Sequence, residues 1–106
     1  MLMSKAIVHA GICGYTTTIQ AQADSKYQVK LNIQSECKHI QKLAENLEEV
    51  NALQEISFRR GLPEALSKGA EFCTHAACPV PVGIIKAVEV AAGLALPKDV
   101  KIELEK

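Results

Sequence analysis

Hydrophobic and polar residues alternate with a period of two through much of the first third of the chain. An apolar run at residues 4–12 is followed by alternating segments at residues 15–24 and 26–34, with turn-forming Asp24-Ser25 between them. Such alternation is typical of antiparallel strands with one face in water. It predicts a three-stranded antiparallel meander. The residues expected to face the core are Thr17, Ile19, Ala21, Ala23, Tyr27, Val29, Leu31 and Ile33.

From Ser35 onward the spacing of apolar residues changes to that of helices. Ser35 is a good N-cap, and the apolar residues that follow it predict a helix over residues 36–49. Asn51 is expected to cap a further short turn. Another helix is predicted from Pro63 to about residue 70, because proline suits the first position of a helix.

Two prolines mark the start of the last predicted helix. Pro79 and Pro81 fit only the opening turn of a helix, and Gly93 is expected to follow its C-terminus. Residues 100–105 alternate again, which predicts a final C-terminal strand. The chain is therefore predicted to form a single α+β domain over residues 1–106, with the helices packed on one face of the sheet.

Composition narrows the class of protein. The 106 residues are 48% hydrophobic, enough for one domain with its own core. Twelve basic and twelve acidic residues balance, so no long-range field favours nucleic acid as a partner. No run approaches the roughly 20 apolar residues that cross a bilayer, and the start of the chain lacks the pattern of a secretory signal. We expect a cytoplasmic protein that binds neither membrane nor nucleic acid; a protein partner or a homodimer stays open.

The cysteines are the residues best equipped for chemistry. In a reducing compartment, cysteines indicate metal or redox use more often than structural disulfides. Cys13 follows the first predicted strand, and Cys37 lies at the start of the first predicted helix, where backbone N–H groups stabilise a thiolate. Antiparallel pairing places both at the same end of the sheet. Cys73 and Cys78 flank the loop before the last helix and are expected to join them there.

These residues predict a metal site. Thiolates and imidazoles bind Zn²⁺ in tetrahedral geometry, and thiolates hold iron–sulfur clusters. His75 lies between Cys73 and Cys78 as a further candidate ligand or a proton shuttle. The predicted metal ligands are Cys13, Cys37, Cys73, Cys78 and His75. The cofactor would be Zn or an iron–sulfur cluster, and the protein a scaffold or carrier.

Two other functions stay open on the same residues. Cys37 or Cys78 would serve a thiol-redox enzyme or a cysteine-nucleophile enzyme, with His75 as the nearby base. Alternatively, the cysteines fill space as small hydrophobic residues in a structural or interaction protein. The residues do not decide whether the protein is an enzyme.

The order of these features resembles the iron–sulfur cluster assembly scaffold family. The shared pattern is a strand ending in Cys13-Gly14, a hairpin, Cys37 at a helix start and Cys78 opening a late helix. The resemblance implies that these three cysteines hold a cluster, with a fourth ligand nearby. It covers most of the chain in outline, and the motifs match at the cysteines.

The chain departs from that family at two motifs. Tyr15 stands where the scaffold has an aspartate after its first Cys-Gly, and two alanines separate His75 from Cys78 where the scaffold has adjacent His-Cys. Cys78-Pro79 before a helix is also similar to the Ser-Cys-Pro-Asp cysteine domain of some ribonucleotide reductases, with Val80 in place of the aspartate. The chain also has the character of an uncharacterised family of small microbial four-cysteine proteins.

Overall fold

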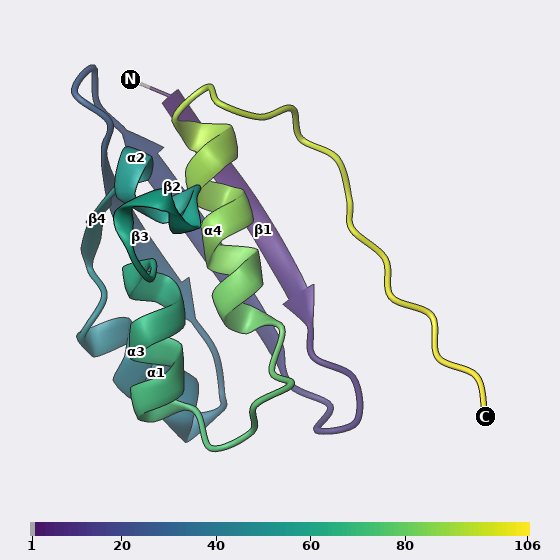
Figure 1. Cartoon of the computed structure of the whole chain (residues 1–106). Coiled ribbons are helices and arrows are strands. Elements are labelled where there is room, and N and C mark those ends of the chain that lie inside the picture. Colours follow the sequence, from purple (N-terminus) through teal and green to yellow (C-terminus); the bar gives the residue numbers. More distant parts are fainter. Residues whose placement is uncertain (1) are drawn as a thin grey trace.

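The computed structural model describes residues 2–106, so Met1 of the predicted domain lies outside it. It consists of an antiparallel sheet and helices that lie in front of it in Figure 1. The strands lie in the order β1 (Leu2–His9), β2 (Thr16–Ala23), β3 (Gln28–Gln34) and β4 (Glu49–Asn51), each antiparallel to its neighbours. The α+β class is confirmed, and one short strand extends the predicted meander.

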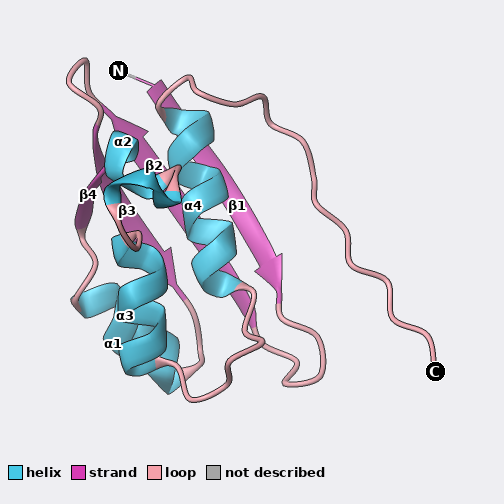
Figure 2. Ribbon diagram, viewed as in Figure 1, coloured by secondary structure: helices cyan, strands magenta, loops and turns pink. Residues whose placement is uncertain are grey.

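The helical segments follow the third strand along the chain (Figure 2). They are α1 (Lys38–Glu45), α2 (Ala52–Glu55), the 3₁₀ turn η1 (Phe58–Arg60), α3 (Glu64–Phe72) and α4 (Val80–Ala91). Helix α4 packs along β1 and β2, α1 packs against β3, and α3 contacts both α1 and α4. No helix within residues 2–106 is long and apolar enough to cross a membrane.

One core joins the sheet to the helices. The predicted inward face of β2 is confirmed, because Thr17, Ile19 and the two alanines that follow in alternation are all buried. Val29 in β3 is also buried. Tyr27 was predicted to face inward, but it lies in the turn before β3 with φ 65° and is 37% exposed. The Asp24 carboxylate accepts hydrogen bonds from the N–H groups of residues 26 and 28, which extends that turn through Tyr27.

The helix predicted over residues 36–49 is shorter than expected. Helix α1 ends at Glu45, and residues 49–51 form β4 instead, with Val50 opposite Val29. Strand pairing prevails here because it buries Val50 and gives the edge of β3 hydrogen-bonded partners. The predicted N-cap was also wrong by two residues: the N-cap is Cys37, whose N–H donates to the hydroxyl of Ser35 at 3.1 Å.

The helix starts near Asn51 and the prolines are close to those predicted. Asn51 caps α2 by accepting the N–H of Leu53 at 2.9 Å. Pro63 precedes α3, and the opening turn of α4 contains Pro81. Gly93 follows α4 with φ 74°, a left-handed conformation that glycine adopts without strain.

The predicted final strand over residues 100–105 is not formed. After Gly93 the chain runs as an extended tail, separated from the sheet in Figure 1. Its apolar side chains Val100, Ile102 and Leu104 are 61%, 77% and 89% exposed. Alternation alone does not make a strand, because the backbone also needs a hydrogen-bonded neighbour, and residues 95–106 make no backbone hydrogen bond to any other part of the described chain.

Candidate thiol site

All four cysteines lie at one end of the sheet, as the antiparallel topology predicts. His9 pairs with Thr16, so the loop that carries Cys13 lies where β1 ends and β2 begins. Gln34 pairs with Thr18 near the start of β2, so the connection from β3 to Cys37 lies at that same end. The loop from α3 to α4, which carries Cys73 and Cys78, also lies there in Figure 1.

Cys73 and Cys78 are held by the ends of two packed helices. Cys73 is the C-cap of α3 and donates its N–H to the Gly69 carbonyl at 2.8 Å. A turn follows, in which the Cys78 N–H donates to the His75 carbonyl at 3.0 Å, and α4 begins two residues later. The helices approach closely because Gly69 has no side chain: a Cβ there would lie 2.7 Å from Pro81 Cγ. Both cysteines are half-buried against the core.

The two thiols border an open hollow of about 370 Å³. Its wall comes from the last turns of α3, the following loop and the first turn of α4. The lining residues are Leu66, Gly69, Ala70, Cys73, Thr74, His75, Ala76, Cys78, Pro81 and Val82. His75 is exposed at this hollow, so its imidazole is accessible from solvent. A small ion or molecule therefore reaches the thiols without any movement of the core.

The ionisation of Cys73 depends on two other cysteines. Burial raises the pKa of its thiol from an ordinary 9.0 to about 11, and the charge of Cys78, a hydrogen bond with Cys78 and the charge of Cys37 add to this effect. Each effect disfavours a thiolate at Cys73. Charge–charge effects of this kind fall with distance, so Cys37 lies near enough to act on Cys73. The structure thus pairs Cys73 with Cys78 and places Cys37 within range of their charges.

Cys37 reaches this group from the sheet side. It is half-buried against the core, and its carbonyl accepts the Gln41 N–H at 2.9 Å as the first hydrogen bond of α1. Ser35 fixes the preceding turn, because its hydroxyl accepts both the Cys37 N–H and the hydroxyl of buried Thr17, at 3.1 and 3.0 Å. Cys37 therefore projects from a backbone tied to β2.

Cys13 is placed apart from the other three. It is exposed in the loop between β1 and β2, and it does not line the hollow. Within residues 2–106, no three side chains of His, Cys, Asp or Glu are close enough to hold a metal ion as they stand. A metal would therefore require the half-buried thiols to change rotamer and converge.

The helix bearing Cys73 is positioned by a carboxylate that no sequence motif indicates. Glu55 is buried, 1% exposed, and accepts the N–H groups of Glu64 at 2.9 Å and Ala65 at 2.8 Å. These are the first N–H groups of α3, which Pro63 leaves without a side-chain cap. Glu55 lies nine residues before Glu64, outside the range of a local capping motif, so sequence spacing gave no signal for it.

Comparison with known proteins gives a family and no activity. No curated protein matches the chain. One family model covers nearly all of it, from residue 4 to residue 104, including the four cysteines and His75. The chain belongs to that family, the family of unknown function DUF6951.

Proposed function

We propose that the protein binds a thiophilic metal, as Zn²⁺ or in an iron–sulfur cluster, through the thiolates of Cys37, Cys73 and Cys78, and acts as a carrier or scaffold for it. One observation carries the proposal: Cys73 and Cys78 form a hydrogen-bonded pair at the wall of an open hollow, and Cys37 lies near enough for its charge to act on Cys73. The resemblance of the cysteine pattern to iron–sulfur scaffolds supports the same reading.

The electrostatics of the metal-free thiols favour a cation. Three thiolates together repel one another, and the Cys73 proton relieves that repulsion. A divalent metal relieves it more fully, because it neutralises the thiolates and competes with the proton for sulfur. The hollow beside Cys73 and Cys78 offers the route of access. His75 at its rim is the proposed fourth ligand, and Cys13, also predicted as a ligand from the sequence, is the other candidate for that position.

A Co²⁺ titration of the reduced, metal-free full chain tests the proposal. Binding by thiolates should produce a sulfur-to-metal charge-transfer band, and Zn²⁺ should displace Co²⁺ and abolish it. Cys37→Ser, Cys73→Ser and Cys78→Ser should each remove or strongly weaken the band. Protein purified without oxygen should be analysed in parallel for iron, sulfide and zinc, together with its absorption spectrum. A titration with no charge-transfer band in the folded wild type would contradict the proposal.

Two pairs of variants identify the fourth ligand. His75→Ala should weaken Co²⁺ binding, whereas His39→Ala, which removes an exposed imidazole from α1, should not. Equal losses from both histidine variants would assign the effect to something other than ligation. Cys13→Ser should leave binding intact if His75 completes the site, and should weaken it as much as Cys73→Ser if the exposed loop closes over the metal.

The contact between Cys73 and Cys78 favours a second candidate, a thiol–disulfide exchange site. The hydrogen bond between them places the two sulfur atoms side by side. In that chemistry the Cys78 thiolate would attack a small-molecule disulfide and release one thiolate. Cys73 would then attack the mixed disulfide after losing its proton, giving a Cys73–Cys78 disulfide and the second thiolate. Incubation with oxidised glutathione and mass analysis would detect the loss of two hydrogen atoms, and Cys73→Ser would instead stop at the glutathione adduct.

A further inference from the structure

The β1 strand forms a long, open edge of the sheet. It pairs only with β2, so no other strand within residues 2–106 pairs with its outer edge. Exposed strand edges are ready templates for another strand, and proteins commonly block them with proline, bulges or several charges. Along Leu2–His9, Lys5 and His9 are the only residues with an acidic or basic side chain. Met3 and Ile7 flank Lys5 and are 72% and 53% exposed.

The inner side of this edge is incompletely covered. Ala6 and Val8 face the core side, pack against the core and remain only half-buried. Helix α4 lies close above them, since the hydroxyl of Ser4 donates to the Ala87 carbonyl at 2.6 Å and Val8 lies where a Cβ on Gly83 would point. Apolar side chains on an added strand would complete the cover beside α4.

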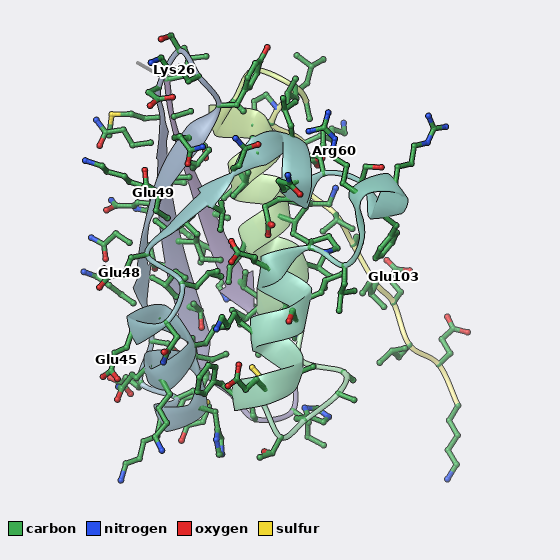
Figure 3. The ribbon with its side chains drawn as sticks, turned by 60° about the vertical axis from the view of Figure 1, so that its left-hand side comes forward. Lys26, Glu45, Glu48, Glu49, Arg60 and Glu103 are labelled. Atoms are coloured by element: carbon green, nitrogen blue, oxygen red, sulfur yellow. The ribbon has the colours of Figure 1, made fainter. Side chains whose placement is uncertain are left out.

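The C-terminal tail carries alternating charged and apolar residues, as a strand pairing with this edge would need. Lys101 Nζ and Glu103 Oε1 form an ion pair at 2.7 Å across one intervening residue, so these alternate side chains already lie on one side of an extended backbone. The apolar residues Val100, Ile102 and Leu104 alternate with them and are exposed. Figure 3 labels Glu103 on the tail.

We infer that two copies of the chain exchange their tails, with residues 100–105 of each copy forming a strand along the β1 edge of the other. One antiparallel register places charged residues opposite each other on the solvent face of the sheet and apolar residues opposite each other on the face under α4. In this register Lys5 lies opposite Glu103 on the solvent face. Ala6 then lies opposite Ile102, and Val8 opposite Val100, on the face that α4 covers. Every tail residue from 100 to 105 meets a residue of β1, and the apolar ones enter the incompletely covered side.

Direction and charge both favour a second copy. In Figure 1 the tail runs in the same direction as β1 of its own chain. A partner related by a two-fold axis perpendicular to the sheet presents its tail in the opposite direction, which gives the antiparallel pairing described above. Such an interface is reciprocal and closes at two copies. Direct β1–β1 pairing centred on Lys5 would instead bring two lysines face to face, which is unfavourable, whereas Glu103 opposite Lys5 is favourable.

Sedimentation of the full chain over a range of concentrations, under reducing conditions, tests this exchange. The wild type should form dimers, and Ile102→Pro should raise the dimer dissociation constant by at least about tenfold, because proline removes an N–H and is poorly tolerated within a strand. Lys106→Pro, outside the paired segment, is the matched control and should dimerise normally. Neither variant threatens folding of the monomer, since residues 95–106 make no backbone hydrogen bond to the body of the chain.

Charge exchange supplies an independent readout. Lys5→Glu should weaken dimerisation, and combining it with Glu103→Lys should restore it. In a mixture of isotope-labelled and unlabelled chains, filtered NMR should detect contacts from Ala6 and Val8 of one chain to Ile102 of the other. A wild type that stays monomeric at NMR concentrations overturns the inference. A dimer that Ile102→Pro leaves intact also overturns it and assigns the interface to another surface.

Discussion

Two helices, α2 and α3, begin with backbone N–H groups that polar side chains accept. At the end of the sheet that carries the cysteines, thiols lie at or near the helix starts instead. Asn51 caps α2, and Glu55 receives the first N–H groups of α3. Around the thiol site, by contrast, the N-cap residues of α1 and α4 are Cys37 and Pro79, and neither caps its helix through a side-chain hydrogen bond. The two regions are built from the same kind of helix start but use it differently.

Capped and uncapped helix starts have different consequences for the protein. A capped helix start gains stability, because its N–H groups have partners within the protein. A helix start without a side-chain cap retains N–H groups and a positive dipole end that favour a thiolate or another anion. We therefore expect substitutions in the Glu55 region to lower the free energy of unfolding with little effect on the proposed metal binding, and substitutions at the thiols to weaken that binding.

The largest expected effect is on stability, from Glu55→Ala. The change removes a buried carboxylate and leaves the N–H groups of Glu64 and Ala65 without an acceptor. The free energy of unfolding should fall by about 3 kcal/mol, because each buried donor left unpaired costs about 1–3 kcal/mol. Chemical denaturation measures this loss. The Co²⁺ affinity of the protein that remains folded should be unchanged.

Two controls define the role of Glu55. Glu55→Gln keeps one acceptor oxygen and should lose less stability than Glu55→Ala. Glu45→Ala removes a carboxylate that is exposed on the surface in Figure 3 and should leave stability within about 0.5 kcal/mol of the wild type. If Glu55→Ala abolished Co²⁺ binding in folded protein, the two regions would not be separable.

A smaller loss of stability is expected from Gly83→Ala, which tests the contact of α4 with the sheet. The added methyl group would clash with the Val8 side chain, so α4 or β1 must shift, at a cost of about 1–3 kcal/mol. Thermal unfolding of the single variant and of the double variant Gly83→Ala/Val8→Ala measures the effect. The double variant should recover part of the loss, because the smaller side chain at position 8 removes the clash. An additive loss would show that another neighbour opposes the methyl group.

Gly69→Ala should affect both stability and the thiol site. Its Cβ would lie 2.7 and 3.2 Å from two carbon atoms of Pro81, so α3 and α4 must move apart close to Cys73. We expect a loss of about 1–2 kcal/mol in unfolding free energy together with weaker Co²⁺ binding. Ser67→Ala, at an exposed position of the same helix, is the control and should change neither quantity. Unchanged Co²⁺ affinity in Gly69→Ala would show that the thiols do not depend on the spacing of the helices.

The sequence was most informative where a local pattern determines the position of a residue in the fold. Alternation located the strands, and antiparallel connection then required Cys13 and Cys37 to share one end of the sheet. It was least informative where two distant segments must meet. The partnership of Glu55 with the start of α3 arises from tertiary packing, and the apolar alternation around Ile102 does not reveal whether an edge lies within reach. The charge effect of Cys37 on Cys73 likewise depends on the packing of α1 against α3, which no sequence spacing encodes.

The smallest expected effect is a pH dependence of stability that arises from Cys73. Its pKa is about 11 in the folded chain against an ordinary 9.0, so the folded state favours the protonated thiol. The stabilisation this provides is complete below pH 9.0 and is lost as the pH rises towards about 11, because the unfolded chain then releases the proton more readily.

Denaturation of reduced, metal-free protein across this window should show a steeper fall in the free energy of unfolding for the wild type than for Cys73→Ser. The difference between the two proteins is the informative quantity, because every other ionisable group is common to both. Cys13→Ser should follow the wild type, since Cys13 is exposed and is not among the causes of the Cys73 shift. Identical slopes for wild type and Cys73→Ser would mean that Cys73 is not held as a half-buried thiol beside Cys78 and near Cys37, and the proposed site would lose its central member.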